Sequence, residues 1–183
     1  MSASLLGPAA PAFDEPLEML DACHGRIEAQ LKTLERLVEH LPRHGVDAAA
    51  RQAIEGVVRY FTVAAPHHHE DEEVDLFPAL HAAVAGRTGE DDEVAALVTR
   101  LLADHRRMDV ARDAMLDHLG KLLAGGAADL SAESVAALAA LYREHIALET
   151  EQLLPLAKRV LPAAVARGLG ERMATRRGAP MPG

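Results

Sequence analysis

Residues 68–78 read HHEDEEVDLFP and residues 145–155 read HIALETEQLLP, so one pattern occurs twice in the chain. In each copy a glutamate follows a histidine by four residues, pairing His68 with Glu72 and His145 with Glu149. Residues four apart on a helix lie on the same face. Each copy therefore directs an imidazole and a carboxylate at one point. Two such pairs on facing helices are typical of a dinuclear metal site inside a helical bundle.

The composition indicates an all-α fold. Apolar residues make up 49% of the 183 residues, aromatic residues make up 3%, and the sequence has no tryptophan, which favours a helical bundle over a β-sandwich. Apolar residues recur at spacings of three and four along four segments, with expected starts near Asp14, Asp47, Glu90 and Ser131. Because short connections place consecutive helices antiparallel, we expect an up-down-up-down antiparallel four-helix bundle.

We expect one domain with short extensions. An extended N-terminal arm is expected over residues 1–13, the bundle over residues 14–165, and a C-terminal tail over residues 166–183. That tail carries the one basic concentration of the chain, which we interpret as solvated. Within the second helix, Val58 is expected to face inward, and Pro66 is expected to remove a backbone hydrogen bond and kink the helix.

Charge and cysteine usage exclude several classes of function. The net charge of −9 argues against nucleic acid as a partner. The first residues lack the features of a secretory signal, and no apolar run is long enough to span a bilayer. Cys23 is the only cysteine, which excludes an intrachain disulfide and a Cys-rich structural zinc site. We expect a cytoplasmic protein that binds neither nucleic acid nor membranes; its oligomeric state is left open.

Polar residues occupy inward positions on all four expected helices. These are His24, His68, Glu72, His105, His145 and Glu149. Burial without partners would cost about 1–3 kcal/mol for each, and bound metal ions offset that cost. Bridging carboxylates with terminal imidazoles suit a pair of iron or manganese ions, with zinc as an alternative. A lone inward histidine is more often a hydrogen-bonded core residue. Together, however, the elements recur in order and indicate one site.

The run His67-His68-His69 allows two registers, because His69 and Glu73 are also four residues apart. The second copy selects His68, since His68 and His145 both precede the proline of their motif by ten residues. We therefore expect His67 and His69 to point aside. A role for His69 as a fifth imidazole ligand is the alternative.

Four further side chains lie beside the expected ligands and have two interpretations each. Tyr142, Glu28 and Asp109 each lie about one helical turn from an expected ligand. They are either additional ligands and contacts of the site, or a packed core tyrosine and two solvated charges, which is the interpretation we prefer. Cys23 adjoins His24, and its thiol is either a redox sensor or a small, partly buried residue.

This set of residues resembles the hemerythrin-like HHE cation-binding domains in their bacterial H-HxxxE-H-HxxxE form, over residues 14–162. The resemblance implies a non-haem di-iron centre in which two carboxylates bridge the ions and two imidazoles bind each ion. The implied ligands are the bridging Glu72 and Glu149, His24 and His68 on one iron, and His105 and His145 on the other.

The sequence departs from the oxygen-carrying hemerythrins, which place His-x-x-x-His on the third helix and His-x-x-x-x-Asp on the fourth. Here Asp109 follows His105 by four residues and Glu149 follows His145 by four. The pattern is more similar to the bacterial hemerythrin-like proteins linked to peroxide or nitric oxide chemistry. It is also similar to the di-iron domain of the iron-centre repair proteins.

A ligand count separates the functions that the resemblance implies. Four imidazoles and two bridging carboxylates supply about eight coordination positions, and an oxo or hydroxo bridge raises the number to about ten. Two six-coordinate irons need about twelve, so about one position on each stays open to a small ligand. We therefore expect reaction with peroxide, nitric oxide or O2. The alternative is a module for oxygen or iron binding, storage or sensing, or an iron donor for iron-centre repair, without turnover.

Overall fold

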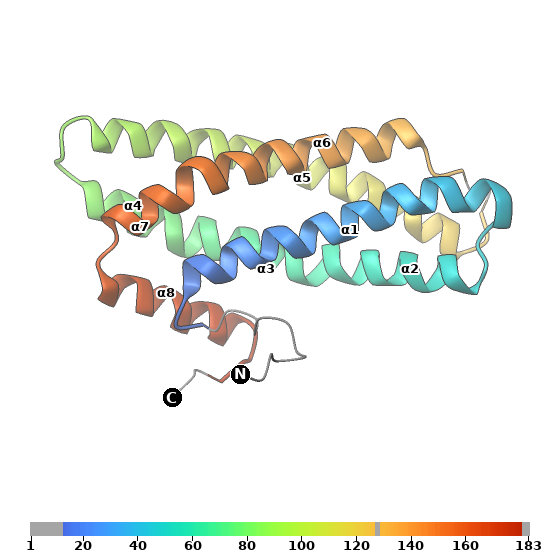
Figure 1. Ribbon diagram of the computed structural model, residues 1–183, viewed down its shortest axis with the longest axis horizontal. Helices are drawn as coiled ribbons and strands as arrows, with labels where there is room; N and C mark the ends of the chain where they lie inside the picture. Colours follow the sequence, from blue (N-terminus) through green and yellow to red (C-terminus); the bar gives the residue numbers. More distant parts are fainter. Residues whose placement is uncertain (1–12, 127–128, 181–183) are drawn as a thin grey trace, which may run out of the picture.

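The computed structural model describes residues 13–126 and 129–180, so residues 1–12 of the expected N-terminal arm lie outside the described residues. Four long helical segments run side by side (Figure 1). They are α1 (Pro16–His44); the series α2 (Ala48–Arg59), α3 (Ala65–Glu70) and α4 (Phe77–Val84); α5 (Glu90–Leu123); and α6 (Ala132–Leu148) with α7 (Leu154–Val160). Consecutive segments are antiparallel, and the fourth segment packs against the first. The expected four-helix bundle is confirmed.

Local sequence explains where several helices begin and end. Asp47 and Ser131 cap α2 and α6 by accepting hydrogen bonds from backbone N–H groups three residues further on. The first helix begins at Pro16, so the start expected at Asp14 is wrong by a short margin. Gly45 follows α1 with a φ of 63°, a left-handed conformation that glycine adopts without a side-chain clash.

Within the described residues, π-helical turns occur at three places in the second and fourth segments. They are η1 (Tyr60–Ala64), η2 (Asp71–Leu76) and η3 (Glu149–Leu153). The helix that follows each turn has a proline in its first two positions: Pro66, Pro78 and Pro155. Proline lacks the N–H of a regular helix and crowds the carbonyl four residues earlier, and a wider turn before it relieves both problems. The proline that ends each copy of the repeated motif thus accompanies a π-turn at its glutamate.

The apolar core consists of two groups of buried side chains, one at each end of the bundle. The group at the α4 and α7 end includes Leu20, Leu76 and Leu101, whereas the group at the other end includes Ile27 and Phe61. Along each long segment, the change from one group to the other falls at the buried histidines and glutamates. The core therefore encloses a polar layer from both sides.

The inward face of the second segment differs in detail from the sequence prediction. Val57 is fully buried and Val58 only partly, so the prediction for Val58 is wrong. Spacings of three and four allow either Val57 or Val58 between the buried Ile54 and Phe61, so helical periodicity alone did not separate the two valines. None of the helices in the described ranges is long and apolar enough to cross a membrane.

A fifth helical segment, α8 (Ala163–Arg176), packs beside one end of the bundle (Figure 1). It contacts η2 and α1, and it spans the boundary expected at residue 165. The interpretation of the basic C-terminal segment as a solvated tail is wrong. Arg176 and Arg177 form ion pairs with the buried carboxylate of Asp71, which the sequence alone did not connect with them.

Candidate metal centre

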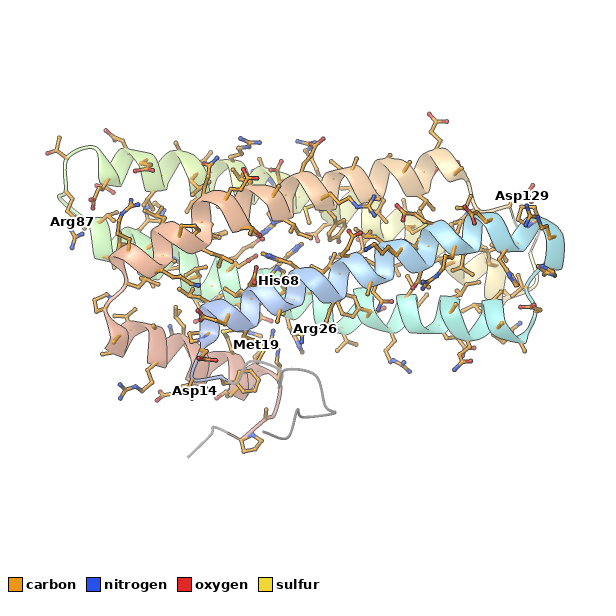
Figure 2. The ribbon with its side chains drawn as sticks, viewed as in Figure 1. Asp14, Met19, Arg26, His68, Arg87 and Asp129 are labelled. Carbon is orange, nitrogen blue, oxygen red and sulfur yellow. The ribbon has the colours of Figure 1, made fainter. Side chains whose placement is uncertain are left out.

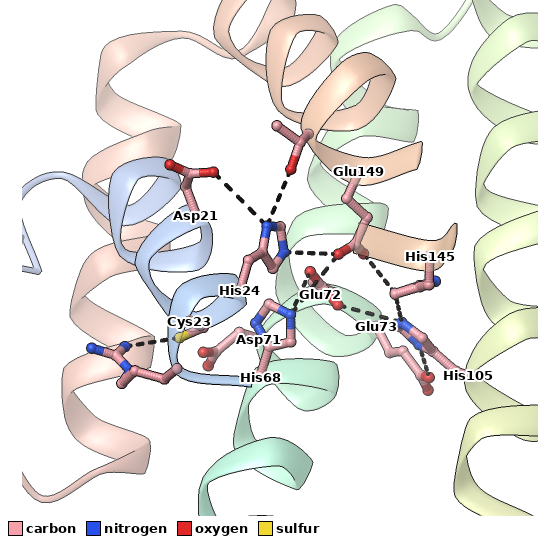
Figure 3. A network of polar contacts seen from close by, with 12 residues as sticks. Asp21, Cys23, His24, His68, Asp71, Glu72, Glu73, His105, His145 and Glu149 are labelled. Carbon is pink, nitrogen blue, oxygen red and sulfur yellow. Dashed lines mark hydrogen bonds and ion pairs between the residues drawn. The ribbon is translucent and has the colours of Figure 1, made fainter. Parts of the chain in front are cut away.

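The residues that the sequence predicts as ligands lie together in the polar layer between the four helical segments (Figure 3). They are His24 on α1, His68 on α3, Glu72 on η2, His105 on α5, His145 on α6 and Glu149 on η3. Each of these side chains is at most 5% exposed. Figure 2 likewise places His68 inside the bundle.

Glu149 stands between two pairs of histidines. Its Oε2 atom lies 2.9 Å from His24 Nε2 and 3.9 Å from His68 Nε2. Its Oε1 atom lies 3.0 Å from His145 Nε2. The two oxygens of one carboxylate therefore face histidines that come from opposite halves of the chain.

The two oxygens of Glu72 likewise face histidines from opposite halves of the chain. Its Oε1 atom lies 3.5 Å from His68 Nε2, and its Oε2 atom lies 3.4 Å from His105 Nε2. Each carboxylate thus offers one oxygen to each histidine pair. This is the placement that a carboxylate needs if it is to bridge two cations.

The spacing of the donor atoms fits adjacent cation positions. Two nitrogens bound at right angles to one metal, each about 2.1 Å from it, would be about 3 Å apart. His105 Nε2 and His145 Nε2 are 3.1 Å apart. Donor atoms also gather in two groups of four within 4.8 Å, and the two groups share both carboxylates. One group contains His24, His68, Glu72 and Glu149, and the other contains Glu72, His105, His145 and Glu149.

His69 belongs to the same cluster. It is 6% exposed, and it forms a further group of close nitrogen donors with His105 and His145. The expectation that His69 points aside is wrong. Consecutive residues of a helix point about 100° apart, and α3 lies among several helices. His68 can therefore face α1 while His69 faces α5.

Outward contacts of two imidazoles, those of His105 and His24, leave their Nε2 atoms directed into the cluster. His105 Nδ1 donates a hydrogen bond to Glu73 Oε1 at 2.6 Å, and Thr150 Oγ1 lies 3.3 Å from His24 Nδ1. A carboxylate or hydroxyl that holds the outer nitrogen orients a metal-binding imidazole. Sequence reasoning weighed Glu73 only as a partner of His69, and it missed Thr150. The only sequence signal for Thr150 was its position directly after Glu149.

Two of the additional candidates are acidic residues at the edge of the cluster or beyond it. Asp109 Oδ1 lies 3.7 Å from His69 Nδ1 and 2.6 Å from a guanidinium nitrogen of Arg112. The adjacent His69 imidazole and the charge of Arg112 hold the pKa of Asp109 below its ordinary value. Glu28 instead pairs with Arg143 at the surface, at 2.9 Å, and belongs to none of the donor groups found in the described residues.

Tyr142 and Cys23 are both buried close to the cluster. The ring of Tyr142 packs against Phe61 with centroids 5.5 Å apart, and within the described residues its hydroxyl has no hydrogen-bond partner. Burial raises the pKa of this hydroxyl above its ordinary value. The Cys23 sulfur accepts a hydrogen bond from Arg26 at 3.0 Å. The structure thus gives the tyrosine a packing role and the cysteine a partner outside the donor groups.

Burial controls the protonation of the cluster in the metal-free protein. Burial raises the pKa of Glu72 well above its ordinary value, and the charge of Glu149 adds to this effect. Although burial acts in the same direction on Glu149, the adjacent His145 imidazole and a hydrogen bond from His24 hold its pKa well below its usual range. Burial also lowers the pKa of His68 well below its ordinary value, and that of His105 to about 3. The neutral imidazoles of His68 and His105 and the ionised carboxylate of Glu149 are therefore available to a cation.

The polar layer contains donor atoms that have no protein partner. Across the described part of the chain, eight buried side-chain nitrogen or oxygen atoms lack a hydrogen bond, and seven of them belong to the cluster. They come from His68, His69, Glu72, His145 and Glu149. Unsatisfied buried polar groups are rare in folded proteins and need an explanation. Bound metal cations fit this donor set, because imidazole nitrogens and carboxylate oxygens are common metal ligands.

Sequence comparison assigns the family. The profile described as "Hemerythrin HHE cation binding domain" matches residues 15–157, which is most of the chain. This chain belongs to the hemerythrin HHE cation-binding family. The resemblance suggested by the sequence is thereby confirmed. All the clustered histidines and glutamates lie within the matched span of this HHE domain, whereas α8 lies beyond it.

A protein relative covers more of the chain than the family profile. An uncharacterized protein of Haemophilus influenzae is 32% identical over 165 residues, which are 90% of this chain and 91% of that protein. The family is defined by cation binding, and this HHE domain has a buried cluster of suitable donors.

Proposed function

We propose that this HHE domain holds two iron ions, and that the centre reacts with peroxide, nitric oxide or O2. Manganese and zinc are the alternative metals. The observation that carries the proposal is the arrangement of two donor groups around two shared carboxylates, Glu72 and Glu149. Nitrogen and carboxylate donors without a thiolate suit iron or manganese better than a soft cation. When bound, iron supplies Lewis-acid and redox chemistry toward small oxygen and nitrogen ligands.

The chain itself limits the access of water to the cluster and orients the donors. The two apolar groups of the core cover the polar layer from both ends of the bundle, and the Phe77 ring lies 6.0 Å from that of His105. Glu73 holds His105 from the outside. A buried, pre-oriented site of this kind strengthens electrostatic interactions and limits access to small ligands.

The position of His69 changes the expected distribution of open coordination positions. If His69 also binds, one side has two imidazoles, from His24 and His68, and the other side has three. Five imidazoles and four carboxylate oxygens provide about nine donors, and an oxo or hydroxo bridge would raise the number to about eleven, against about twelve positions on two six-coordinate ions. We therefore propose that a small ligand binds to the ion on the side of His24 and His68, instead of to both ions equally.

This asymmetry favours one second candidate function. An open coordination position on only one ion suits reversible binding of O2 or another small ligand, as in storage, carriage or sensing, without turnover. In both functions the partner is a small diatomic or peroxide ligand. They differ in whether the ligand is chemically changed.

Metal analysis tests the centre. Protein grown in iron-rich medium is expected to contain about two irons per chain and to show near-ultraviolet absorption of an oxo-bridged di-iron site. His68→Ala and Glu149→Ala are expected to lose most of the metal, whereas His81→Ala, outside the donor groups on α4, keeps it. A metal-free wild-type protein, or unchanged metal content in both cluster variants, would contradict the proposal.

Reactivity then separates the two functions. Evolution of oxygen from added peroxide, abolished by Glu149→Ala, would support turnover. A spectral change with O2 that reverses when O2 is removed, without consumption of peroxide, would support reversible binding instead.

A further inference from the structure

The helix α8 packs against one end of the bundle, next to the candidate metal centre. Its Leu169 and Met173 side chains are buried, and they belong to the apolar group at the α4 and α7 end of the core. The helix contacts η2, the π-turn that contains Glu72. Because α8 lies beyond the span matched by the family profile, the cation-binding character of the family does not account for it.

The side of η2 that faces α8 carries two buried acidic residues. Asp71 directly precedes Glu72, and Asp75 follows it by three residues. The side chain of Asp71 is 0% exposed and that of Asp75 is 4% exposed. Neither residue belongs to the donor groups of the centre among the described residues. A buried carboxylate is costly unless it is paired and hydrogen-bonded.

Arginines at the C-terminal end of α8 provide that pairing. Arg177 contacts Asp71 at 2.5 Å, and Arg176 contacts Asp75 at 2.7 Å. Arg176 also pairs with Asp71, and Arg172 pairs with Asp75. All four carboxylate oxygens of the two aspartates accept hydrogen bonds from these guanidinium groups. The network therefore connects α8 to both ends of the turn that holds Glu72.

The start of the described chain packs on another side of α8. Gly170 lies so close to the backbone of Phe13 that a Cβ atom at this position would overlap the Phe13 carbonyl oxygen. Phe13 itself packs against the same apolar group as α8. The helix is thus fixed between η2 and the segment that enters α1. A side chain at Gly170 would force one of these contacts to open.

We propose that α8 is a C-terminal latch that positions Glu72 for metal binding, by holding η2 through the ion pairs of Asp71 and Asp75 with Arg172, Arg176 and Arg177. The inference rests on the proposed function only in taking Glu72 as a metal ligand. If α8 moves away, two buried carboxylates lose their partners and η2 must rearrange to solvate them. Glu72 lies between them, so its carboxylate leaves its place opposite His68 and His105.

Hydrogen–deuterium exchange on the metal-free protein tests whether α8 holds η2. In Arg176→Gln, peptides that cover residues 70–77 are expected to exchange about ten-fold faster, while those of α2 keep the wild-type rate. Arg167→Gln is the matched control. Arg167 is an exposed arginine on the same helix, and it makes no ion pair within the described residues. If Arg176→Gln unfolds globally, Arg172→Gln decides, because Arg172 is half exposed and contacts only the edge of the network.

Titration with cobalt(II) tests whether holding η2 positions Glu72. Arg176→Gln and Gly170→Ala are expected to weaken cobalt affinity about ten-fold and to change the visible spectrum, as loss of an outer contact to a metal ligand does. Arg167→Gln is expected to match the wild type. The latch proposal would be overturned if Arg176→Gln and Gly170→Ala both showed the exchange rates or the cobalt affinity of the control Arg167→Gln. Absence of cobalt and iron binding in the wild type would instead overturn the proposed function.

Discussion

The imidazole rings of His69 and His105 stack with their centroids 4.0 Å apart and their planes 10° apart. His69 follows His68 directly, yet the two residues contribute to different donor groups. One turn of α3 therefore supplies histidines to both sides of the proposed di-iron centre. This relationship makes the two sides chemically unequal.

His69→Ala is expected to weaken binding of one of the two metal ions by about 10–100-fold, because it removes one of three imidazoles on that side. Stepwise cobalt(II) titration measures the effect. His67→Ala is the matched control, since His67 is partly exposed and belongs to no donor group among the described residues. Equal affinities in the two variants would exclude His69 as a ligand.

Glu73→Gln tests the outward contact of His105. The substitution keeps the size of the side chain but replaces a charged acceptor with a neutral amide, so it weakens the 2.6 Å hydrogen bond that orients the imidazole. Metal affinity is expected to fall about ten-fold or more, as measured by competition with a chelator. Glu55→Gln, on the exposed face of α2, should leave the affinity unchanged. An equal loss in both variants would mean that overall charge, rather than this contact, sets the affinity.

Metal binding is expected to release protons. Because burial raises the pKa of Glu72, the metal-free protein retains a proton there at pH values where an exposed glutamate is ionised. A cation must displace this proton, so affinity rises with pH until the raised pKa is passed, and is constant above it. His68 and His105 contribute no proton in this range, because their lowered pKa values keep them neutral.

Calorimetry in buffers of different ionisation enthalpy measures this proton release. About one proton per filled centre is expected from the wild type. The variant Glu72→Gln, which has no proton to lose at this position, should release none. Affinity that does not change with pH would contradict the assigned protonation of Glu72.

Tyr142→Phe is expected to raise the free energy of unfolding of the metal-free protein by about 1 kcal/mol, because it removes a buried hydroxyl that lacks a partner. Chemical denaturation measures this quantity. Metal content should stay at the wild-type value. Tyr60→Phe serves as the control, since Tyr60 is only partly buried and is expected to gain nothing. A loss of stability or metal in Tyr142→Phe would show that the hydroxyl acts in the site.

The fold could be predicted because its main signals are local. Spacings of three and four placed the long helices, and the side chains of Asp47 and Ser131 marked two of their starts. The π-turns could not be predicted in the same way. The prolines at 66, 78 and 155 indicate an interruption, but only packing shows that each is absorbed as a widened turn.

By itself, the sequence determined the bundle and the inward positions of His24, Glu72 and Glu149, because helical periodicity assigns each residue to a face. Two things were decided only by the tertiary structure. Neighbouring helices on both sides of α3 bring His69 into the cluster, although helical periodicity predicted that His69 would point away from the site. The folding of α8 onto η2 turns a basic segment into partners for Asp71, because the burial of a carboxylate requires a cation close to it in space, at whatever distance along the chain.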